Sequence, residues 1–409
     1  MLRPMLALSV TTVLLATAVA GTGCLSDSDP ATSDNDGGPG TGTDGGPGTD
    51  TDSSVDTSEA GTPDDPTKND AIADSTQNIT YRDDLANHPG CTKEGIEARL
   101  QIDGKPGGYT AATLPDFPCS AKAYPAPANE DTTRAIIVLV HGNSSTPADW
   151  EAHADDPADP DTPMIAERLV ADGWRVFAAD FRYDKVPDPA DAQGNPAKNF
   201  DHGWATPILE RLLKSLHAEY PSRKINLAGF SLGTTIIRDA LRRMHHRGEK
   251  PFEFVHALHL ASGANHGVVT FSSLCGDPNN PTNKTMRGTV ACQLGNRDNY
   301  APTPFLTPLN GTNGDWETPC ANGINAYGQN NVCGGNKVLY TTVVYKDPPN
   351  GPLQDEFVSE TSSALKGAEN KTVTQEDTTT YFLNGLFKIH NGSIRSAEGV
   401  TIALQALER

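Results

Sequence analysis

The fold is decided by the stretch Ile225-Asn226-Leu227-Ala228-Gly229-Phe230-Ser231-Leu232-Gly233. Its first four residues predict a strand, and Thr234 to Met244 predicts a helix. Gly229 and Gly233 flank Ser231 in a GxSxG pattern, which is typical of a sharp strand-to-helix turn that exposes the serine. The following helix directs the positive end of its dipole at this turn. Ser231 is therefore the candidate nucleophile, and a serine that only caps the helix is the alternative.

Strands and helices alternate on both sides of this turn. Ile136 to Val140 is an unbroken apolar run, which is typical of a strand buried on both faces of a sheet. From Trp204 to Leu216 the large apolar residues recur at helical spacing. This alternation predicts an α/β fold, with a mostly parallel sheet covered by helices on both faces. The expected strands are 136–140, 175–179, 224–228, 255–261 and 338–345, and the expected helices are 164–172, 204–216, 232–245, 361–366 and 393–407.

The first expected strand leads directly into His141-Gly142-Asn143. In acyl-transfer sites built on a GxSxG turn, the loop at this place donates one backbone N–H to the oxyanion, and the residue after the nucleophile donates another. Asn143 and Leu232 are the donors expected here. His141 lies upstream of Ser231, whereas the base of such a site comes last along the chain. We therefore expect His141 to shape the loop rather than to act as the base.

A serine nucleophile needs a base and an acid, which follow it along the chain in the order acid, then histidine. His390 lies in a turn before the last expected helix and is the candidate base. Asp347 and Asp355 both follow the strand 338–345. Either carboxylate can hold the imidazole in the required tautomer and stabilise its positive charge. The residues alone leave both acids open.

The other downstream histidines have structural interpretations. His245 and His246 lie among three arginines on the helix that follows the turn, and we expect a solvated basic face there. His256 and His259 flank or occupy the strand 255–261 and are expected to be partly buried and neutral. His266 begins the next segment and is placed to line the site.

Several segments resemble the compact lipases, that is, the small bacterial triacylglycerol lipases and the fungal lipase B type. They are Val140-His141-Gly142, Asn226 to Gly233, Thr303-Pro304-Phe305-Leu306, Leu309-Asn310, Tyr340-Thr341-Thr342 and Asp355-Glu356-Phe357-Val358. The resemblance spans residues 136–409 and implies an α/β-hydrolase fold that hydrolyses hydrophobic esters through a Ser-Asp-His triad. In that family an Asp-x-x-Val segment follows the strand, which favours Asp355 over Asp347. A helix and the catalytic histidine come next, which matches His390.

The chain departs from this family in two places. The segment from Lys346 to Gln354 is longer than the family's turn, which keeps Asp347 open as the alternative acid. Residues 263–336 are loop-rich and hold four cysteines, so the family's acyl pocket does not transfer to this chain. We expect this insert to form a disulfide-stapled cap or wall over the site. The Asn143-Ser144-Ser145 loop is also similar to some extracellular polyester depolymerases.

The amino terminus predicts export. Residues 1–23 contain one positive charge and an apolar run, Leu6 to Ala20, which is too short for a membrane span and is typical of a signal peptide. Cys24 resembles the lipidated cysteine of a bacterial lipobox, although Gly21 stands where leucine is usual. We expect a membrane-anchored lipoprotein in the periplasm or on the cell surface. Cleavage near Ala20 instead gives a secreted protein.

Composition and cysteine spacing divide the rest of the chain. Residues 24–75 begin with the lipidated Cys24 and predict a disordered Asp/Ser/Thr/Gly/Pro linker. Residues 76–409 are expected to form the catalytic domain, with 76–130 as an extension packed on it. Once Cys24 carries lipid, six cysteines remain, and we expect neighbours along the chain to pair in an oxidising compartment. The expected disulfides are Cys91–Cys119, Cys275–Cys292 and Cys320–Cys333.

Charge and spacing exclude some functions and leave others open. The net charge of −20 disfavours nucleic-acid binding, which needs clustered lysine and arginine. The cysteine spacing does not fit zinc, and the expected chemistry needs no metal or organic cofactor. The expected partners are a hydrophobic ester, such as a lipid, and a membrane reached through the anchor; no oligomeric state is predicted. The alternatives are a polyester depolymerase, less strongly a peptidase or thioesterase, and a catalytically silent surface-binding lipoprotein.

Overall fold

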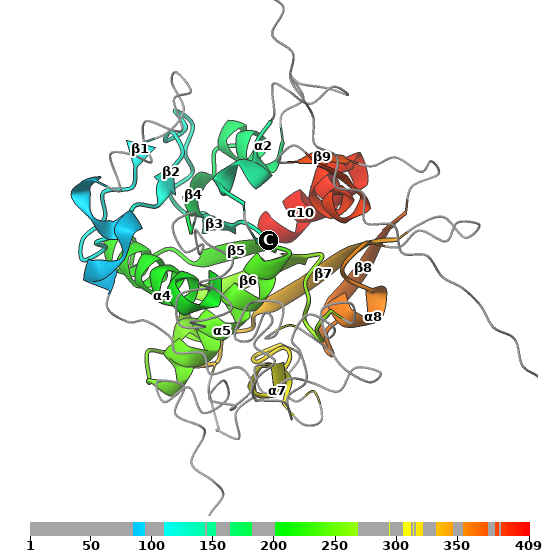
Figure 1. The fold of residues 1–409 in the computed structure, drawn as a ribbon. Helices are drawn as coiled ribbons and strands as arrows, with labels where there is room; N and C mark the ends of the chain where they lie inside the picture. Colours follow the sequence, from blue (N-terminus) through cyan, green and yellow to red (C-terminus); the bar gives the residue numbers. More distant parts are fainter. Residues whose placement is uncertain are drawn as a thin grey trace, which may run out of the picture. The chain divides into compact units, whose positions relative to one another are not determined.

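An eight-stranded sheet in the order β1-β2-β4-β3-β5-β6-β7-β8 lies at the centre of the fold (Figure 1). Strands β3 to β8 run parallel. Two short strands extend the β4 edge: β2 pairs with β4 and β1 pairs with β2, each antiparallel to its neighbour. A separate hairpin joins β9 and β10. The strands are β1 Thr110–Ala111, β2 Lys122–Ala123, β3 Ile136–Val140, β4 Arg175–Ala179, β5 Ile225–Phe230, β6 Val255–Ala261, β7 Leu339–Lys346, β8 Glu369–Thr374, β9 Tyr381–Leu383 and β10 Leu386–Lys388.

This computed structural model describes most of the chain beyond residue 84. All the described residues belong to the unit Ser58–Arg409. The expected signal peptide, Cys24 and the linker lie outside them, as do Asp347 and the Cys275–Cys292 pair. The described residues are 85–94, 110–143, 145–152, 164–181, 201–268, 294, 306–311, 314, 316–321, 333–346, 355–374, 381–383 and 386–409.

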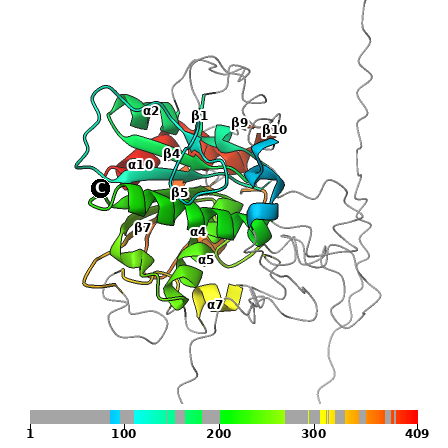
Figure 2. The ribbon, with the colours of Figure 1, turned by 90° about the vertical axis from the view of Figure 1, so that its left-hand side faces the viewer.

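Helices cover both faces of the sheet, as Figure 2 shows, with α4 and α5 on one side and α2 and α10 on the other. Along β3 the side chains alternate between two buried clusters: Ile136 and Val138 pack in the cluster with α4 and α5, whereas Ile137 and Leu139 pack in the cluster with α2 and α10. The α/β-hydrolase fold predicted from the sequence is thereby confirmed. The α-helices are α2 Ile165–Ala171, α4 Asp201–Glu219, α5 Leu232–His246, α7 Leu306–Asn310, α8 Glu360–Ser363, α9 Gly392–Arg395 and α10 Ala397–Leu407.

The termini of several elements differ from the sequence-based expectation. The last predicted helix is broken into α9 and α10, because Ser396 is extended (φ −69°, ψ 152°) and caps α10 by accepting the N–H of Gly399. Strand β8 was missed, since Glu369–Thr374 is polar and lacks the apolar run of an inner strand. The amino-terminal extension contributes β1 and β2, so it joins the sheet edge rather than only packing on the domain.

The predicted solvated basic face of α5 is wrong. Arg242, Arg243 and His245 are buried, and the side chain of Arg243 lies 3.4 Å from Glu210 on α4. Arg247 binds the other oxygen of Glu210 at 2.5 Å. Burial raises the pKa of Glu210, and the two arginines oppose that shift. Partners 33 to 37 residues away in sequence therefore turn a charged stretch into an internal contact between two helices.

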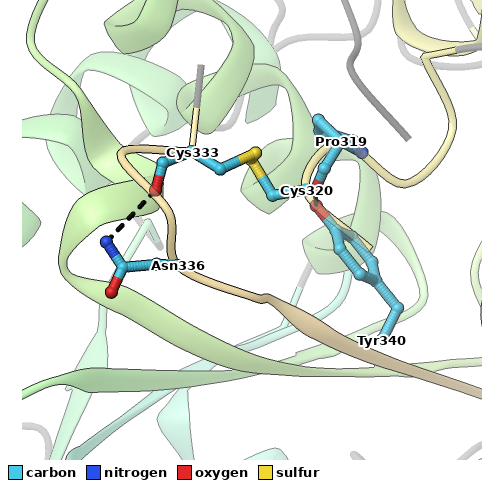
Figure 3. The surroundings of a disulfide bond; sticks show 5 residues. All are labelled: Pro319, Cys320, Cys333, Asn336 and Tyr340. Carbon is cyan, nitrogen blue, oxygen red and sulfur yellow. Dashed lines mark hydrogen bonds between the residues drawn. A yellow bond between two sulfur atoms is a disulfide. The ribbon is translucent and has the colours of Figure 1, made fainter. Parts of the chain in front are cut away.

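Two of the expected disulfides lie among the described residues and are confirmed. Cys91 pairs with Cys119 in the extension, and Cys320 pairs with Cys333 in the insert. In Figure 3, the side chain of Asn336 donates to the carbonyl oxygen of Cys333 at 3.1 Å. The hydroxyl of Tyr340 on β7 donates to the carbonyl oxygen of Pro319 at 3.1 Å. The disulfide therefore joins two parts of the insert, and the hydroxyl of Tyr340 ties the first of them to the start of β7.

A buried arginine anchors other parts of the insert to α5. The guanidinium of Arg238 donates to the carbonyl oxygen of Leu309 at 2.9 Å and to the side-chain oxygens of Asn310 and Asn265 at 2.8 and 3.2 Å. The side chain of Asn310 also donates to the carbonyl oxygen of Asn265 at 2.9 Å. The helix that follows Ser231 therefore fixes the position of these insert segments.

None of the described helices has the length and apolar character needed to cross a bilayer.

His259 is more deeply buried than the sequence suggests. It lies within β6 and is fully buried, and neither ring nitrogen has a hydrogen-bond partner among the described residues. Burial, helped by the charge of Arg409, lowers its pKa from 6.5 to about 3. As the pH falls, His259 of the unfolded chain is protonated near pH 6.5, whereas His259 of the folded protein is protonated only near pH 3. The stability contributed by neutral His259 is therefore complete above pH 6.5 and is lost as the pH falls toward 3.

We predict that His259→Leu removes this pH dependence. Between pH 7 and pH 4 the wild type should lose about 3 kcal/mol more unfolding free energy than the variant. Urea titrations at several pH values measure the difference. His256→Leu is the matched control, because His256 lies on the same strand but is only partly buried, and it should follow the wild type more closely. Parallel curves for wild type and His259→Leu would contradict the prediction.

Candidate active site

The turn between β5 and α5 holds Ser231 in a conformation that is rare outside glycine. Its φ is 53° and its ψ is −120°. The glycines on either side are required by close packing. A Cβ at Gly229 would lie 2.9 Å from the backbone of Gly233, and a Cβ at Gly233 would lie 2.5 Å from the carbonyl oxygen of Val140. The GxSxG pattern therefore reflects the close approach of α5 to the ends of β5 and β3.

Backbone hydrogen bonds fix Ser231 at the carboxyl end of the sheet. Its N–H donates to the carbonyl oxygen of Ala261, the last residue of β6, at 2.8 Å. Its own carbonyl oxygen accepts from the N–H and the hydroxyl of Thr234 at 3.1 and 2.8 Å. The side chain of Ser231 is partly exposed. Leu232 is the first residue of α5, so its N–H has no acceptor within the helix.

His390 and Asp355 lie in contact. Asp355 follows β7 and His390 follows β10, and the Nδ1 atom of the histidine lies 2.8 and 2.7 Å from the two carboxylate oxygens. Both side chains are buried. The carboxylate is only an acceptor, so Nδ1 carries a proton and, in the neutral ring, Nε2 is left as the acceptor. Nε2 is buried and has no hydrogen-bond partner among the described residues.

Two phenylalanines hold the ring of His390 near the turn. The ring of Phe230, which precedes Ser231, lies 4.9 Å from the imidazole between centroids. The ring of Phe357 meets it edge-on at 5.1 Å. Since Phe230 is the last residue of β5, the segment that carries His390 meets the strand end that carries Ser231. The structure thus brings Ser231, Asp355 and His390, all three predicted from the sequence, to one end of the sheet.

The segment after β7 also binds the backbone around His390. Glu356 accepts the N–H of Ile389 and the N–H of His390, one at each carboxylate oxygen and both at 2.8 Å. Asp355 accepts the N–H of Phe357 and of Val358, each at 2.9 Å. The acid segment therefore holds the histidine by its backbone as well as by its ring, although the two lie 35 residues apart in sequence.

The loop after β3 is held by His141 and Asp149. The N–H of Phe181 donates to Nε2 of His141 at 2.9 Å, which leaves the proton on Nδ1, 2.9 Å from the carbonyl oxygen of Gly142. Asp149 accepts the N–H of Gly142 at 2.9 Å. In a trans peptide the C=O and the next N–H point in opposite directions, so the N–H of Asn143 points away from His141.

This loop lies against the serine. A Cβ at Gly142 would lie 3.2 Å from Cβ of Ser231. Asn143 is exposed, and His141 has the loop-shaping place expected of it. Three further residues that hold the site were missed from the sequence: Asp149, Glu356 and Ser262. Asp149 accepts the N–H of Gly142, seven residues earlier, whereas Glu356 and Ser262 contact segments that lie at least 33 residues away. Only Glu356, next to the predicted acid, had a position that could have drawn attention to it.

The remaining predicted residues either lie elsewhere or are not described. Both ring nitrogens of His266 have partners outside the triad. The carboxylate of Glu317 lies 3.2 Å from Nε2, and the carbonyl oxygen of Ser362 lies 3.2 Å from Nδ1. The alternative acid, Asp347, lies outside the described residues. Within the described ranges no group of three or more His, Cys, Asp or Glu side chains could hold a metal ion.

Comparisons with known proteins give likenesses in structure only. No protein-family model matches the chain. No curated protein matches it in sequence either.

Solved structures of lipases and esterases are similar to this chain. A lipase of Bacillus licheniformis, BlEst2 in its mature form, is 17% identical, with a TM-score of 0.42 over 75% of this chain and 100% of that one. Lipase B of Aspergillus fumigatus is 15% identical, with a TM-score of 0.41 over 69% of this chain and 55% of that one. An esterase of Pyrobaculum calidifontis is 16% identical, with a TM-score of 0.37 over 80% and 92%. Because these scores are below 0.5, the fold assignment rests on the strand order and the turn at Ser231.

The backbone conformation of Ser231 generates a prediction about stability. Ser231→Gly should have an unfolding free energy about 1 kcal/mol higher than Ser231→Ala. Glycine relieves the backbone strain of the positive φ in the folded state, and this gain exceeds the stability lost because glycine raises the entropy of the unfolded chain. Thermal or urea unfolding of the two variants measures this. Ala228→Gly, in the regular part of the same strand, is the control and should lower stability. Equal stability of the two Ser231 variants would contradict a strained turn.

Proposed function

We propose that the protein is a serine carboxylic ester hydrolase that acts through Ser231, Asp355 and His390. The observation that carries this proposal is the Asp355–His390 pair packed against Phe230, beside the strand end that bears Ser231. Nε2 of His390 has no hydrogen-bond partner in the part of the chain that the structure describes. The likeness of the sequence to the compact lipases adds support. A protein that only binds a surface needs neither a serine with a positive φ nor a histidine oriented by a carboxylate. This arrangement therefore disfavours a catalytically silent lipoprotein.

The reaction follows from the roles of these groups. Nε2 of His390 takes the proton from the hydroxyl of Ser231 as its oxygen attacks the ester carbonyl. Asp355 stabilises the imidazolium that forms. The backbone N–H groups of Leu232 and Asn143 bind the oxyanion. His390 then gives its proton to the leaving alcohol. In the second half, Nε2 of His390 takes a proton from the water that attacks the acyl-enzyme and gives it to the oxygen of Ser231, which releases the carboxylic acid and the free enzyme. These steps need no metal or organic cofactor.

We predict that Ser231→Ala abolishes covalent labelling by a fluorophosphonate and lowers kcat/KM for p-nitrophenyl esters by about 10⁴-fold or more. Asp355→Asn should lower kcat/KM by about 10³- to 10⁴-fold, because the amide favours the wrong histidine tautomer. Asp347→Asn is the matched control for the alternative acid and should leave activity unchanged. Circular dichroism checks that each variant is folded.

Different outcomes identify which part of the proposal is wrong. If the wild type and Ser231→Ala label and hydrolyse alike, the protein is not a serine hydrolase of this type. If Asp347→Asn loses activity while Asp355→Asn retains it, the acid assignment is wrong but the nucleophile stands.

The substrate class is inferred to be a lipid or other hydrophobic ester, on the strength of the sequence resemblance. The second candidate is a polyester, because the loop His141-Gly142-Asn143 resembles the start of the oxyanion loop in some extracellular polyester depolymerases. A series of p-nitrophenyl esters of increasing chain length separates lipase from short-chain esterase. Clearing of a polyhydroxyalkanoate film tests for the depolymerase.

We further infer an exported protein that a lipidated Cys24 attaches to a membrane. The signal-like residues 1–23 and the polar stretch 24–75 support this, and the two disulfides are typical of an oxidising compartment. In this arrangement the polar stretch is a spacer between the anchor and the catalytic domain.

We predict that Cys24→Ser moves the protein from the membrane fraction to the soluble exported fraction, because one acyl chain or more is lost. Fractionation of cells that express the full chain, with and without globomycin, measures this. Cys91→Ser controls for the loss of a different cysteine and should leave membrane association unchanged. Membrane association of Cys24→Ser at the wild-type level would remove the anchor from the proposal.

A further inference from the structure

Ser262 lies at the end of β6, one strand away from Ser231, and shares its unusual backbone. Its φ is 45°, and it is fully buried. Its N–H donates to the carbonyl oxygen of Val343 on β7 at 2.7 Å, just as the N–H of Ser231 donates to Ala261 on β6. Two neighbouring strands therefore each end at a serine with positive φ. The mechanism above uses only the first of them.

The hydroxyl of Ser262 is directed at the acid. Its Oγ lies 2.9 Å from Oδ2 of Asp355, the same oxygen that lies 2.7 Å from Nδ1 of His390. It also lies 2.9 Å from Oγ of Ser393 and 3.4 Å from the carbonyl oxygen of His390. Ser262 thus contacts the acid, the segment that carries the base, and the helix α9 that follows it.

Each hydroxyl has one proton to donate, which limits how these contacts are made. An ionised carboxylate can only accept, so the contact between Ser262 and Asp355 uses the proton of Ser262. Ser393 donates its own proton to the carbonyl oxygen of His390 at 3.2 Å.

The remaining acceptor sites of Asp355 are already used. Oδ1 takes the N–H groups of Phe357 and Val358, and His390 approaches both oxygens. Among the described residues, Ser262 is the side-chain donor other than His390 that reaches this carboxylate. Without its hydroxyl, Oδ2 would keep only the contact with the imidazole, and nothing else would hold the plane of the carboxylate on that side.

We propose that Ser262 is a positioning residue of the catalytic site, which fixes the carboxylate of Asp355 in the orientation that aligns His390 with Ser231. The proposal rests on the proposed hydrolase function. The left-handed backbone supports it, because glycine would adopt this φ without strain, and a serine at such a position calls for a contribution from its side chain. The hydroxyl on Asp355 is that contribution.

The test compares two variants that lose the same hydroxyl but differ in backbone strain. Ser262→Ala keeps the Cβ and the strain, whereas Ser262→Gly removes both. If the hydroxyl matters, both variants of the full chain should lose about 10- to 100-fold in kcat, the range for one hydrogen bond to a charged group. KM should stay unchanged because the fully buried Ser262 does not meet the substrate. Ser262→Gly should be at least as stable as Ser262→Ala, so unfolding cannot explain its loss.

Ser393→Ala is the matched control. It deletes a buried serine hydroxyl from the same network, but Ser393 does not contact the carboxylate, so its loss in kcat should be clearly smaller. A spectroscopic readout is independent of activity. The low-field proton NMR signal of Nδ1–H of His390, identified by its absence in His390→Gln, should shift in both Ser262 variants and stay close to its wild-type position in Ser393→Ala.

Three results would overturn the proposal: wild-type kcat in Ser262→Gly together with a loss in Ser262→Ala, an equal loss in Ser393→Ala, or an unchanged Nδ1–H signal in the Ser262 variants. The first would assign the effect to the backbone, and the second to packing alone. If the wild type hydrolyses no ester, the proposed function fails, and the NMR comparison still decides whether Ser262 orients the Asp355–His390 pair.

Discussion

The close approach of α5 to the ends of β5 and β3 is the constraint on which the rest of the site depends. A side chain at Gly233 would overlap the carbonyl oxygen of Val140, so only glycine lets the helix start at this place. The chain then turns so sharply that Ser231 is left with a positive φ. The same contact sets the start of α5, and with it the position of Arg238, which anchors the described parts of the insert.

The strand ends next to this turn continue its pattern. β5, β6 and β7 are parallel, so their carboxyl ends lie at one edge of the sheet, where Ser231, Ser262 and the segment with Asp355 follow one another. His390 arrives from a distant part of the chain and is held there by Asp355, by Glu356 and by two aromatic rings. A rigid sheet thus supplies three of the positions, and the last segment is tied down on it by charge-assisted hydrogen bonds.

Buried ionisable side chains in this fold are accommodated in different ways. Glu210 of α4 meets Arg243 and Arg247 of α5, so the basic stretch of α5, which looks solvated in sequence, packs against α4 through charges. His259 is held neutral in the apolar interior instead, at the expense of stability at low pH. In the site, the buried carboxylate of Asp355 accepts from the ring of His390, the hydroxyl of Ser262 and the N–H groups of Phe357 and Val358.

The sequence by itself determined the fold class, the strand before Ser231 and the helix after it, and two cysteine pairs, because these depend on local periodicity, small residues at a tight turn and neighbours along the chain. It also led to Asp355 and His390 through their order and a family resemblance. Only the tertiary structure decided that these two side chains meet, that Asp149 and Glu356 hold the flanking loops, and that the basic stretch of α5 is internal. Except for the contact of Asp149 with Gly142, these contacts join residues tens of positions apart. No pattern in the chain marks which of the many serines, acids and arginines will face each other once the sheet has formed.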